Sequence, residues 1–197
     1  MDIIFEPTKK VFNAYKSLPN LEFEFRLGKK NGSMFDTNIG EEKFNKIKEA
    51  LENYQEWEEK SEKTITSYFY NDYRYEINEI TEETSTVKKK KISKNDFILP
   101  NECLDVRCSV SQEVPQPDFA IEEVQEVDFV RCKKRTSYIR KNLSIDLTIV
   151  TGDPEDMDDE SDSSYEVELE MINPKDIRNE NALYNLIYKI FCILKTL

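Results

Sequence analysis

The sequence contains no histidine among its 197 residues. This absence excludes Ser-His and Cys-His nucleophilic catalysis, and it removes the most common general base. Any hydrolysis would therefore rest on carboxylates, lysines and a metal ion. The sequence also has no apolar run long enough to cross a bilayer, and no signal peptide is recognisable.

The four cysteines lack the spacing of a metal or redox motif. Cys103, Cys108, Cys132 and Cys192 form no CxxC pair, and there is no histidine to complete a zinc site. We therefore expect reduced thiols within the fold of an intracellular protein.

The charge balance is acidic, with a net charge of −12 and 35% charged residues. This argues against broad electrostatic adhesion to nucleic acid, but it allows a phosphate substrate in a local basic pocket. Much of the acid lies between Asp153 and Asp162, which we interpret as a solvated, mobile loop. Aromatic residues make up 11% of the chain, so a single folded domain over 1–197 is expected.

The periodicity of the sequence predicts a mainly β (α+β) fold. Short alternating segments bounded by turn signals predict eight strands, at 21–28, 63–70, 73–80, 84–93, 104–114, 127–139, 142–151 and 164–172. Helical spacing of apolar residues predicts flanking helices at 7–17, 41–58 and 176–196, with a loop at 29–40. The short connections indicate antiparallel pairing, and eight such strands can close into a barrel.

Two distant strands carry glutamates at every second position. Residues two apart share one face of a strand, so one acidic face holds Glu22 and Glu24 with Arg26, and the other holds Glu166, Glu168 and Glu170. Stacked carboxylates repel one another unless a cation lies between them. Carboxylate oxygens are the ligands that Mg²⁺ and Mn²⁺ prefer, so the pattern predicts a divalent cation site.

Other strands carry bases or mixed polar side chains on one face. These faces hold Arg74 and Glu76; Arg107, Ser109, Ser111 and Glu113; Arg131, Lys133 and Arg135; and Ser144, Asp146 and Thr148. In the run Lys88–Lys91 the parity is ambiguous, and Lys89 and Lys91 are on the polar face if Ile92 faces the core. The simplest alternative is a sheet with one solvated side. However, the separation of signs by strand favours a cavity where acids hold a cation and bases hold an anion.

In this order, the motifs Glu22-x-Glu24-x-Arg26, Arg107-x-Ser109-x-Ser111-x-Glu113, Arg131-x-Lys133-x-Arg135, Asp146 and Glu166-x-Glu168-x-Glu170 resemble the triphosphate tunnel metalloenzymes. More specifically, the chain resembles the RNA 5′-triphosphatases of fungal, protozoan and large-DNA-virus (mimivirus-type) mRNA capping systems. The resemblance covers about residues 20–172. It implies an eight-stranded antiparallel barrel with a hydrophilic tunnel, which removes the γ-phosphate from the 5′-triphosphate end of nascent RNA. Family members also hydrolyse nucleoside triphosphates with Mn²⁺ or Co²⁺.

The resemblance also implies roles for individual residues. Direct ligands of Mg²⁺ or Mn²⁺ would be Glu22, Glu24 and Glu170, with Glu168 supporting the metal site or its water. The phosphates would be gripped by Arg74, Lys89, Arg131, Lys133 and Arg135, with Arg26 and Arg107 near the tunnel wall. Glu166 and Asp146 would orient basic neighbours, and Glu113 would orient or deprotonate the attacking water.

Partners and context follow from the same resemblance. The chain ends inside its last predicted helix, at Thr196-Leu197, which suggests the N-terminal domain of a longer capping enzyme with a guanylyltransferase in the same polypeptide. A monomer is favoured over a homodimer, without a membrane partner, and the expected location is the virion or the infected host cytoplasm. Two alternatives remain open: another triphosphate tunnel enzyme such as a tripolyphosphatase, and a non-enzymatic β-rich interaction domain.

Overall fold

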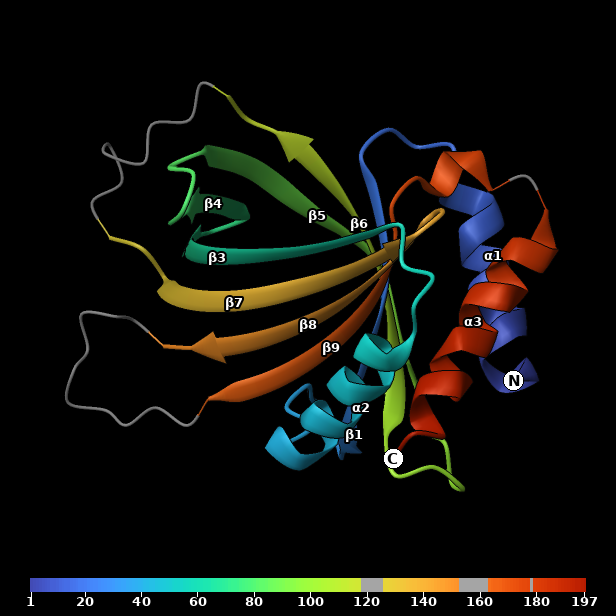
Figure 1. Cartoon of the computed structure of the whole chain (residues 1–197). Coiled ribbons are helices and arrows are strands. Elements are labelled where there is room, and N and C mark those ends of the chain that lie inside the picture. Colours follow the sequence, from blue (N-terminus) through green and yellow to red (C-terminus); the bar gives the residue numbers. More distant parts are fainter. Residues whose placement is uncertain (118–125, 153–162, 178) are drawn as a thin grey trace.

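A computed structural model describes residues 1–117, 126–152, 163–177 and 179–197, so the acidic run 153–162 lies outside the described residues. Eight antiparallel strands form a closed barrel in the order β1-β6-β5-β4-β3-β7-β8-β9, and pairing of β1 with β9 closes it (Figure 1). The strands are β1 (Leu21–Asn31), β3 (Glu59–Tyr70), β4 (Tyr73–Asn78), β5 (Thr84–Phe97), β6 (Asp105–Pro115), β7 (Phe129–Arg140), β8 (Leu143–Thr151) and β9 (Ser164–Met171). The predicted eight-stranded barrel is confirmed.

One strand was not predicted. β2 (Met34–Asp36) pairs with the end of β1, within the segment expected to be a loop. The hairpin forms because β1 continues to Asn31 and Gly32 adopts a φ of +57°, which glycine accepts without strain. A Cβ at Gly28 would lie 2.2 Å from the carbonyl oxygen of Asp36, so glycine is required where β2 crosses β1.

Three helices lie on one side of the barrel, and α1 and α3 run side by side there (Figure 1). They are α1 (Asp2–Tyr15), α2 (Glu41–Asn53) and α3 (Glu180–Leu194). The 3-10 turn η2 (Pro174–Asp176) comes directly before α3. None of the helices in the described ranges is long and apolar enough to cross a membrane.

The helix boundaries differ from the predicted ones. α1 begins at Asp2, before the predicted start at residue 7, and contains Pro7. α2 ends at Asn53, because Tyr54 is extended and the indole of Trp57 donates to the Leu51 carbonyl at 2.7 Å. α3 begins after Asn179, whose side chain accepts from the backbone of Ala182 and caps the helix.

The hydrophobic core lies outside the barrel wall, between the wall and the helices. Phe23, Phe25 and Leu27 of β1 are fully buried, and they belong to the same cluster as Ile187 and Ile190 of α3. Since side chains alternate along a strand, burying the phenylalanines outward turns the alternating Glu and Arg residues of β1 into the barrel. The interior of the barrel is therefore polar.

Candidate active site

The strand register brings the two acidic faces together inside the barrel. Glu24 of β1 is opposite Glu170 of β9 on one side and Ser109 of β6 on the other. Arg26 is likewise opposite Glu168 and Arg107. Directly opposed residues of an antiparallel pair share one face, so segments more than 140 residues apart in sequence line one cavity wall.

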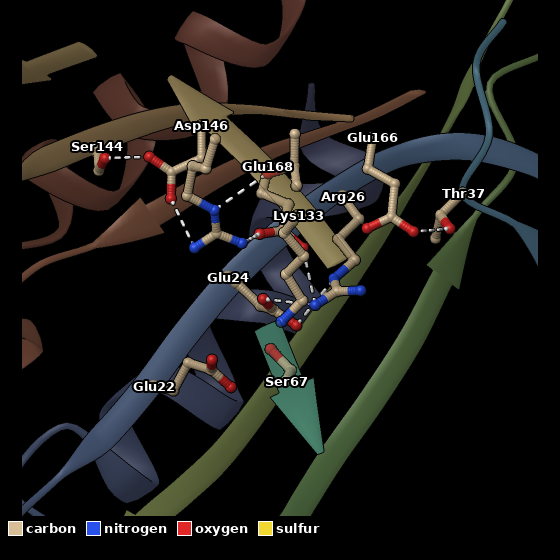
Figure 2. A network of polar contacts seen from close by, with 12 residues as sticks. Glu22, Glu24, Arg26, Thr37, Ser67, Lys133, Ser144, Asp146, Glu166 and Glu168 are labelled. Atoms are coloured by element: carbon tan, nitrogen blue, oxygen red, sulfur yellow. Dashed lines mark hydrogen bonds and ion pairs between the residues drawn. The ribbon is translucent and has the colours of Figure 1, made fainter. Parts of the chain in front are cut away.

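A network of ion pairs connects four strands, β1, β7, β8 and β9, at the centre of this wall, and within it Glu24, Arg26 and Glu168 point toward one another (Figure 2). Glu168 lies 2.8 Å from Arg26 and 2.9 Å from Arg135. Asp146 is 3.4 Å from Arg135 and accepts a hydrogen bond from Ser144. Burial opposes ionisation of Glu168, but the two arginines prevail and lower its pKa to about 2. Both of its oxygens therefore already have cationic partners.

Glu24 and Glu170 are the two carboxyls of this wall whose ionised form the protein stabilises least. Burial raises the pKa of Glu170 to about 8, and the charges of Glu22 and Asp146 add to this rise. The side-chain carboxyl of Glu170 has no hydrogen bond or ion pair within the described part of the chain. Burial also raises the pKa of Glu24 to about 7, although Glu24 lies 3.1 Å from Arg26. Arg26 is at the same time paired with Glu168.

A second network lies on β1, β4, β5 and β6. The Lys89 ammonium contacts the Glu22 carboxylate and lies 3.1 Å from that of Glu113. Glu22 also accepts a hydrogen bond from the Ser111 hydroxyl. Glu113 also accepts from Arg74 at 2.9 Å. Burial would raise the pKa of Glu22, but Lys89 lowers it below its usual value. Within the lysine run, Lys89 thus faces the cavity, whereas Lys88 lies over the Tyr73 ring.

Glu76 and Ser67 join this network without having been predicted as site residues. Glu76 accepts from Ser67 at 2.7 Å and from Lys133 at 3.1 Å, and it lies 3.4 Å from Arg74. The Nε of Arg74 is buried and has no well-oriented acceptor. The polar alternation of 73–77 placed Arg74 and Glu76 on one face, but only the register shows that Glu76 is opposite Ser67.

The remaining predicted residues lie on the same face at other levels. Arg131 pairs with Glu166 at 2.7 Å, and Thr37 donates to the same carboxylate oxygen (Figure 2). Thr37 follows β2, and no sequence signal marks it. Arg107 is separate from these networks: it pairs with Asp96 at 2.6 Å and stacks over Phe35.

The acidic side chains form no ready-made metal cage in the described ranges, since no three of them converge as a ligand cluster. Their charge state nevertheless fits a cation. Glu24 and Glu170 are opposed across β1 and β9, and both have raised pKa values because burial disfavours their charged form and neighbouring carboxylates add to the effect. A divalent cation would remove the repulsion between these carboxylates, and the all-oxygen donor set suits Mg²⁺ or Mn²⁺.

A closed antiparallel barrel with acids and bases inside and its apolar core outside belongs to the triphosphate tunnel class of folds. The sequence profile of the family described as mRNA capping enzyme, beta chain, matches residues 22–185. The chain therefore belongs to the family of the mRNA capping enzyme beta chain.

Individual relatives agree with this membership. The mRNA-capping enzyme subunit beta of Kluyveromyces lactis is 31% identical over 122 residues, which cover 53% of this chain and 22% of that protein. The alignments span only 22% to 29% of the length of the curated relatives.

Solved structures share the fold of this chain. That of the Schizosaccharomyces pombe Pct1 RNA triphosphatase has a TM-score of 0.80 at 18% identity, covering 98% of this chain and 93% of that one. That of the RNA triphosphatase domain of a trifunctional mimivirus mRNA capping enzyme has a TM-score of 0.66 at 22% identity, covering 97% of each chain.

Proposed function

We propose that this chain is a metal-dependent RNA 5′-triphosphatase. It hydrolyses the bond to the γ-phosphate of triphosphate-ended RNA and leaves a diphosphate end, which is the first step of mRNA capping. One observation carries the proposal: acids on β1 and β9 with raised pKa values face the same barrel interior as cations on β4, β5 and β7. Membership of the capping enzyme family supports it.

In this proposal the acids of β1 and β9 hold Mg²⁺ or Mn²⁺. Glu22, Glu24 and Glu170 are the ligands, and Glu168 fixes Arg26 and Arg135 beside them. The bound ion supplies Lewis acidity and a template for the triphosphate oxygens. Lys89 and Ser111 both contact the Glu22 carboxylate and lower its pKa. Glu22 is therefore ionised at neutral pH and can bind the metal ion.

The cations of the opposite strands bind the phosphate oxygens. Arg74, Lys89 and Lys133 are each tied to a carboxylate at a distance of at most 3.4 Å. These carboxylates hold the cations in place, so the site is preorganised for an anion. Arginines offer paired donors and lysines add point charges. Arg131 and Arg135 extend this surface along β7, and Arg26 and Arg107 line the wall next to it.

Glu113 orients the attacking water. It lies between Arg74 and Lys89, and its Oε1 is buried without a well-oriented hydrogen-bond donor. An acceptor in that state can take a hydrogen bond from a water molecule bound beside the two cations. This role makes Glu113 a general base rather than a metal ligand.

The test is release of phosphate from γ-labelled triphosphate RNA, with Mg²⁺, with Mn²⁺ and with EDTA. We expect metal-dependent release of the γ-phosphate alone, with a diphosphate end remaining, and loss of release in Glu24→Gln. Nucleoside triphosphates should also be hydrolysed with Mn²⁺. Preference for inorganic tripolyphosphate over RNA in direct competition would instead assign another triphosphate substrate. No release under any metal would overturn the enzymatic assignment.

We further propose that the diphosphate product passes to a guanylyltransferase domain of the same polypeptide, that the chain acts as a monomer, and that it works in the virion or infected host cytoplasm. Co-purification of both activities as one polypeptide from its natural source would test the first point. Sedimentation of the purified chain would test the second.

A further inference from the structure

An apolar groove of about 1000 Å³ lies on the outside of the barrel, and its lining is separate from the polar interior. α2 and α3 form two of its walls on the same side of the molecule (Figure 1). Between them the groove is lined by Leu143 and Ile145 of β8 and by Ile177, which follows η2. None of the residues assigned to triphosphate hydrolysis lines it.

The groove follows one face of each helix. On α3 the lining residues recur every three or four positions, at Ala182, Asn185, Leu186, Lys189 and Ile193. This stripe runs along roughly 16 Å of helix at 1.5 Å per residue. On α2 the same spacing gives Ile47, Ala50 and Leu51, and Tyr54 follows directly after the helix. Two such stripes facing one space suit an elongated helical occupant better than a compact small molecule.

Aromatic side chains provide preformed anchor points in the groove. Trp57 lies 5.0 Å from Tyr54 and 5.6 Å from Tyr138 between ring centroids, and its indole is fixed by the Leu51 carbonyl. Tyr54 and Tyr188 are 36% and 47% exposed. Rigid, partly exposed aromatic rings in an apolar groove are typical of the residues that dominate protein–protein binding energy.

The charge of the lining is opposite to that of the whole chain. Its ionisable residues are Arg140, Lys141, Lys189 and Asp176, three bases and one acid in a chain of net charge −12. Arg140 is paired with Glu56 at 2.6 Å. The side chains of Lys141 and Lys189 have no ion pair within the residues that the structure describes. The groove thus presents two free cations beside an apolar surface.

We propose that this groove binds an acidic amphipathic α-helix of a partner protein. The apolar stripe of the partner helix packs between α2 and α3, and its carboxylates lie beside Lys141 and Lys189. A second copy of this chain fits less well, because two bodies of charge −12 repel each other. The binding site is separate from the catalytic cavity, so both can be occupied together.

The experiment uses two helical peptides with the same leucine stripe, one with glutamates and one with lysines at its polar positions. Trp57 is the only tryptophan of the chain, so its emission reports occupation of the groove directly. We expect the acidic peptide to shift this emission and to bind roughly tenfold or more tightly than the basic one. Phosphate release from triphosphate RNA should be unchanged.

Two variants make the result specific. The double substitution Lys141→Asp and Lys189→Glu should reverse the preference between the peptides; aspartate suits position 141, whose φ is +54°. The matched control Lys10→Glu with Lys90→Glu makes the same charge change at exposed lysines outside the groove and should leave the preference intact. Filling the groove with Ala50→Trp should abolish binding, measured by anisotropy of a labelled peptide.

Any of three results would overturn the proposal. The first is equal binding of both peptides, and the second is failure of the acidic peptide to bind the wild-type chain. The third is binding of the acidic peptide that survives both the charge reversal and Ala50→Trp. Sedimentation as a dimer that Ala50→Trp dissociates would assign the groove to a second copy of this chain instead. Protection of Trp57 by RNA alone would assign it to nucleic acid.

Discussion

Arg26 of β1 and Glu168 of β9 are directly opposite each other, and their side chains form an ion pair of 2.8 Å. The second oxygen of Glu168 lies 2.9 Å from Arg135 of β7. One buried carboxylate therefore connects three strands across the inside of the barrel. The arrangement makes Glu168 a structural element of the site as much as a chemical one.

Removal of this carboxylate should destabilise the fold. Glu168→Ala leaves two arginines in the barrel without their shared partner, and breaking a buried ion pair in this way costs about 3–5 kcal/mol. Urea unfolding would measure the loss. Glu42→Ala removes the exposed pair that Glu42 forms with Lys46 on α2, and we expect no measurable change there. Equal stability of the Glu168 variant and the wild type would contradict the role assigned to it.

Permanent neutralisation of Glu24 or Glu170 should reduce turnover at least a hundredfold while leaving the fold intact. Glu24→Gln and Glu170→Gln each keep the size of the side chain but remove a metal ligand, which should cost about 2–4 kcal/mol of transition-state stabilisation, a hundredfold or more in rate. Steady-state phosphate release with Mn²⁺ would measure the effect. Glu49→Gln, at an exposed position of α2, is the matched control. Normal turnover of both variants would exclude Glu24 and Glu170 as ligands.

The fold and the interior face could largely be predicted from the sequence, because both depend on a period of two. The alternation of Glu22, Glu24 and Arg26 with buried phenylalanines leaves one arrangement that hides the apolar side. Pairings between strands could not be predicted in the same way. That Ser67 is opposite Glu76, or that Thr37 reaches Glu166, depends on register and on the unpredicted β2.

The metal-free protein should lose stability as the pH rises from 5 to 8. In the folded state the pKa of Glu24 is about 7 and that of Glu170 about 8, both above the usual 4.5. The folded chain thus holds more protons than the unfolded chain in this window, so its stability falls with rising pH. Since the sequence has no histidine, few other groups titrate there.

Urea unfolding in EDTA at pH 5.5 and pH 8 would measure this loss, which we expect to be on the order of 5 kcal/mol for the two carboxyls together. Mn²⁺ binds the deprotonated carboxylates, so its stabilising effect should grow over the same range. Glu170→Gln should flatten the dependence in EDTA. A wild-type stability that is constant or rises toward pH 8 without metal would contradict the raised pKa values.

The two adjacent lysines Lys88 and Lys89 provide the sharpest test of the register. Lys89 contacts Glu22 and Glu113 inside the barrel, whereas Lys88 lies over the Tyr73 ring on the outer face, 5.1 Å from its centroid. The register shifts only after Lys91, between Lys91 and Ser93, so the alternation through Lys88 and Lys89 is regular.

Lys89→Met should therefore reduce kcat/KM for triphosphate RNA about a hundredfold, because it removes a preorganised charge at the phosphates. Lys88→Met makes the same chemical change one residue away and should leave turnover within about twofold, since an exposed cation over an aromatic ring contributes mainly to local packing. Lys89→Met should also unfold at a lower urea concentration than Lys88→Met, because it leaves Glu22 and Glu113 without their shared cation, so turnover is compared under conditions where both variants are folded. If Lys88→Met were the impaired variant, β5 would present its other face to the cavity, and the acid–base pairing of Lys89 with Glu22 and Glu113 would have no part in binding the substrate.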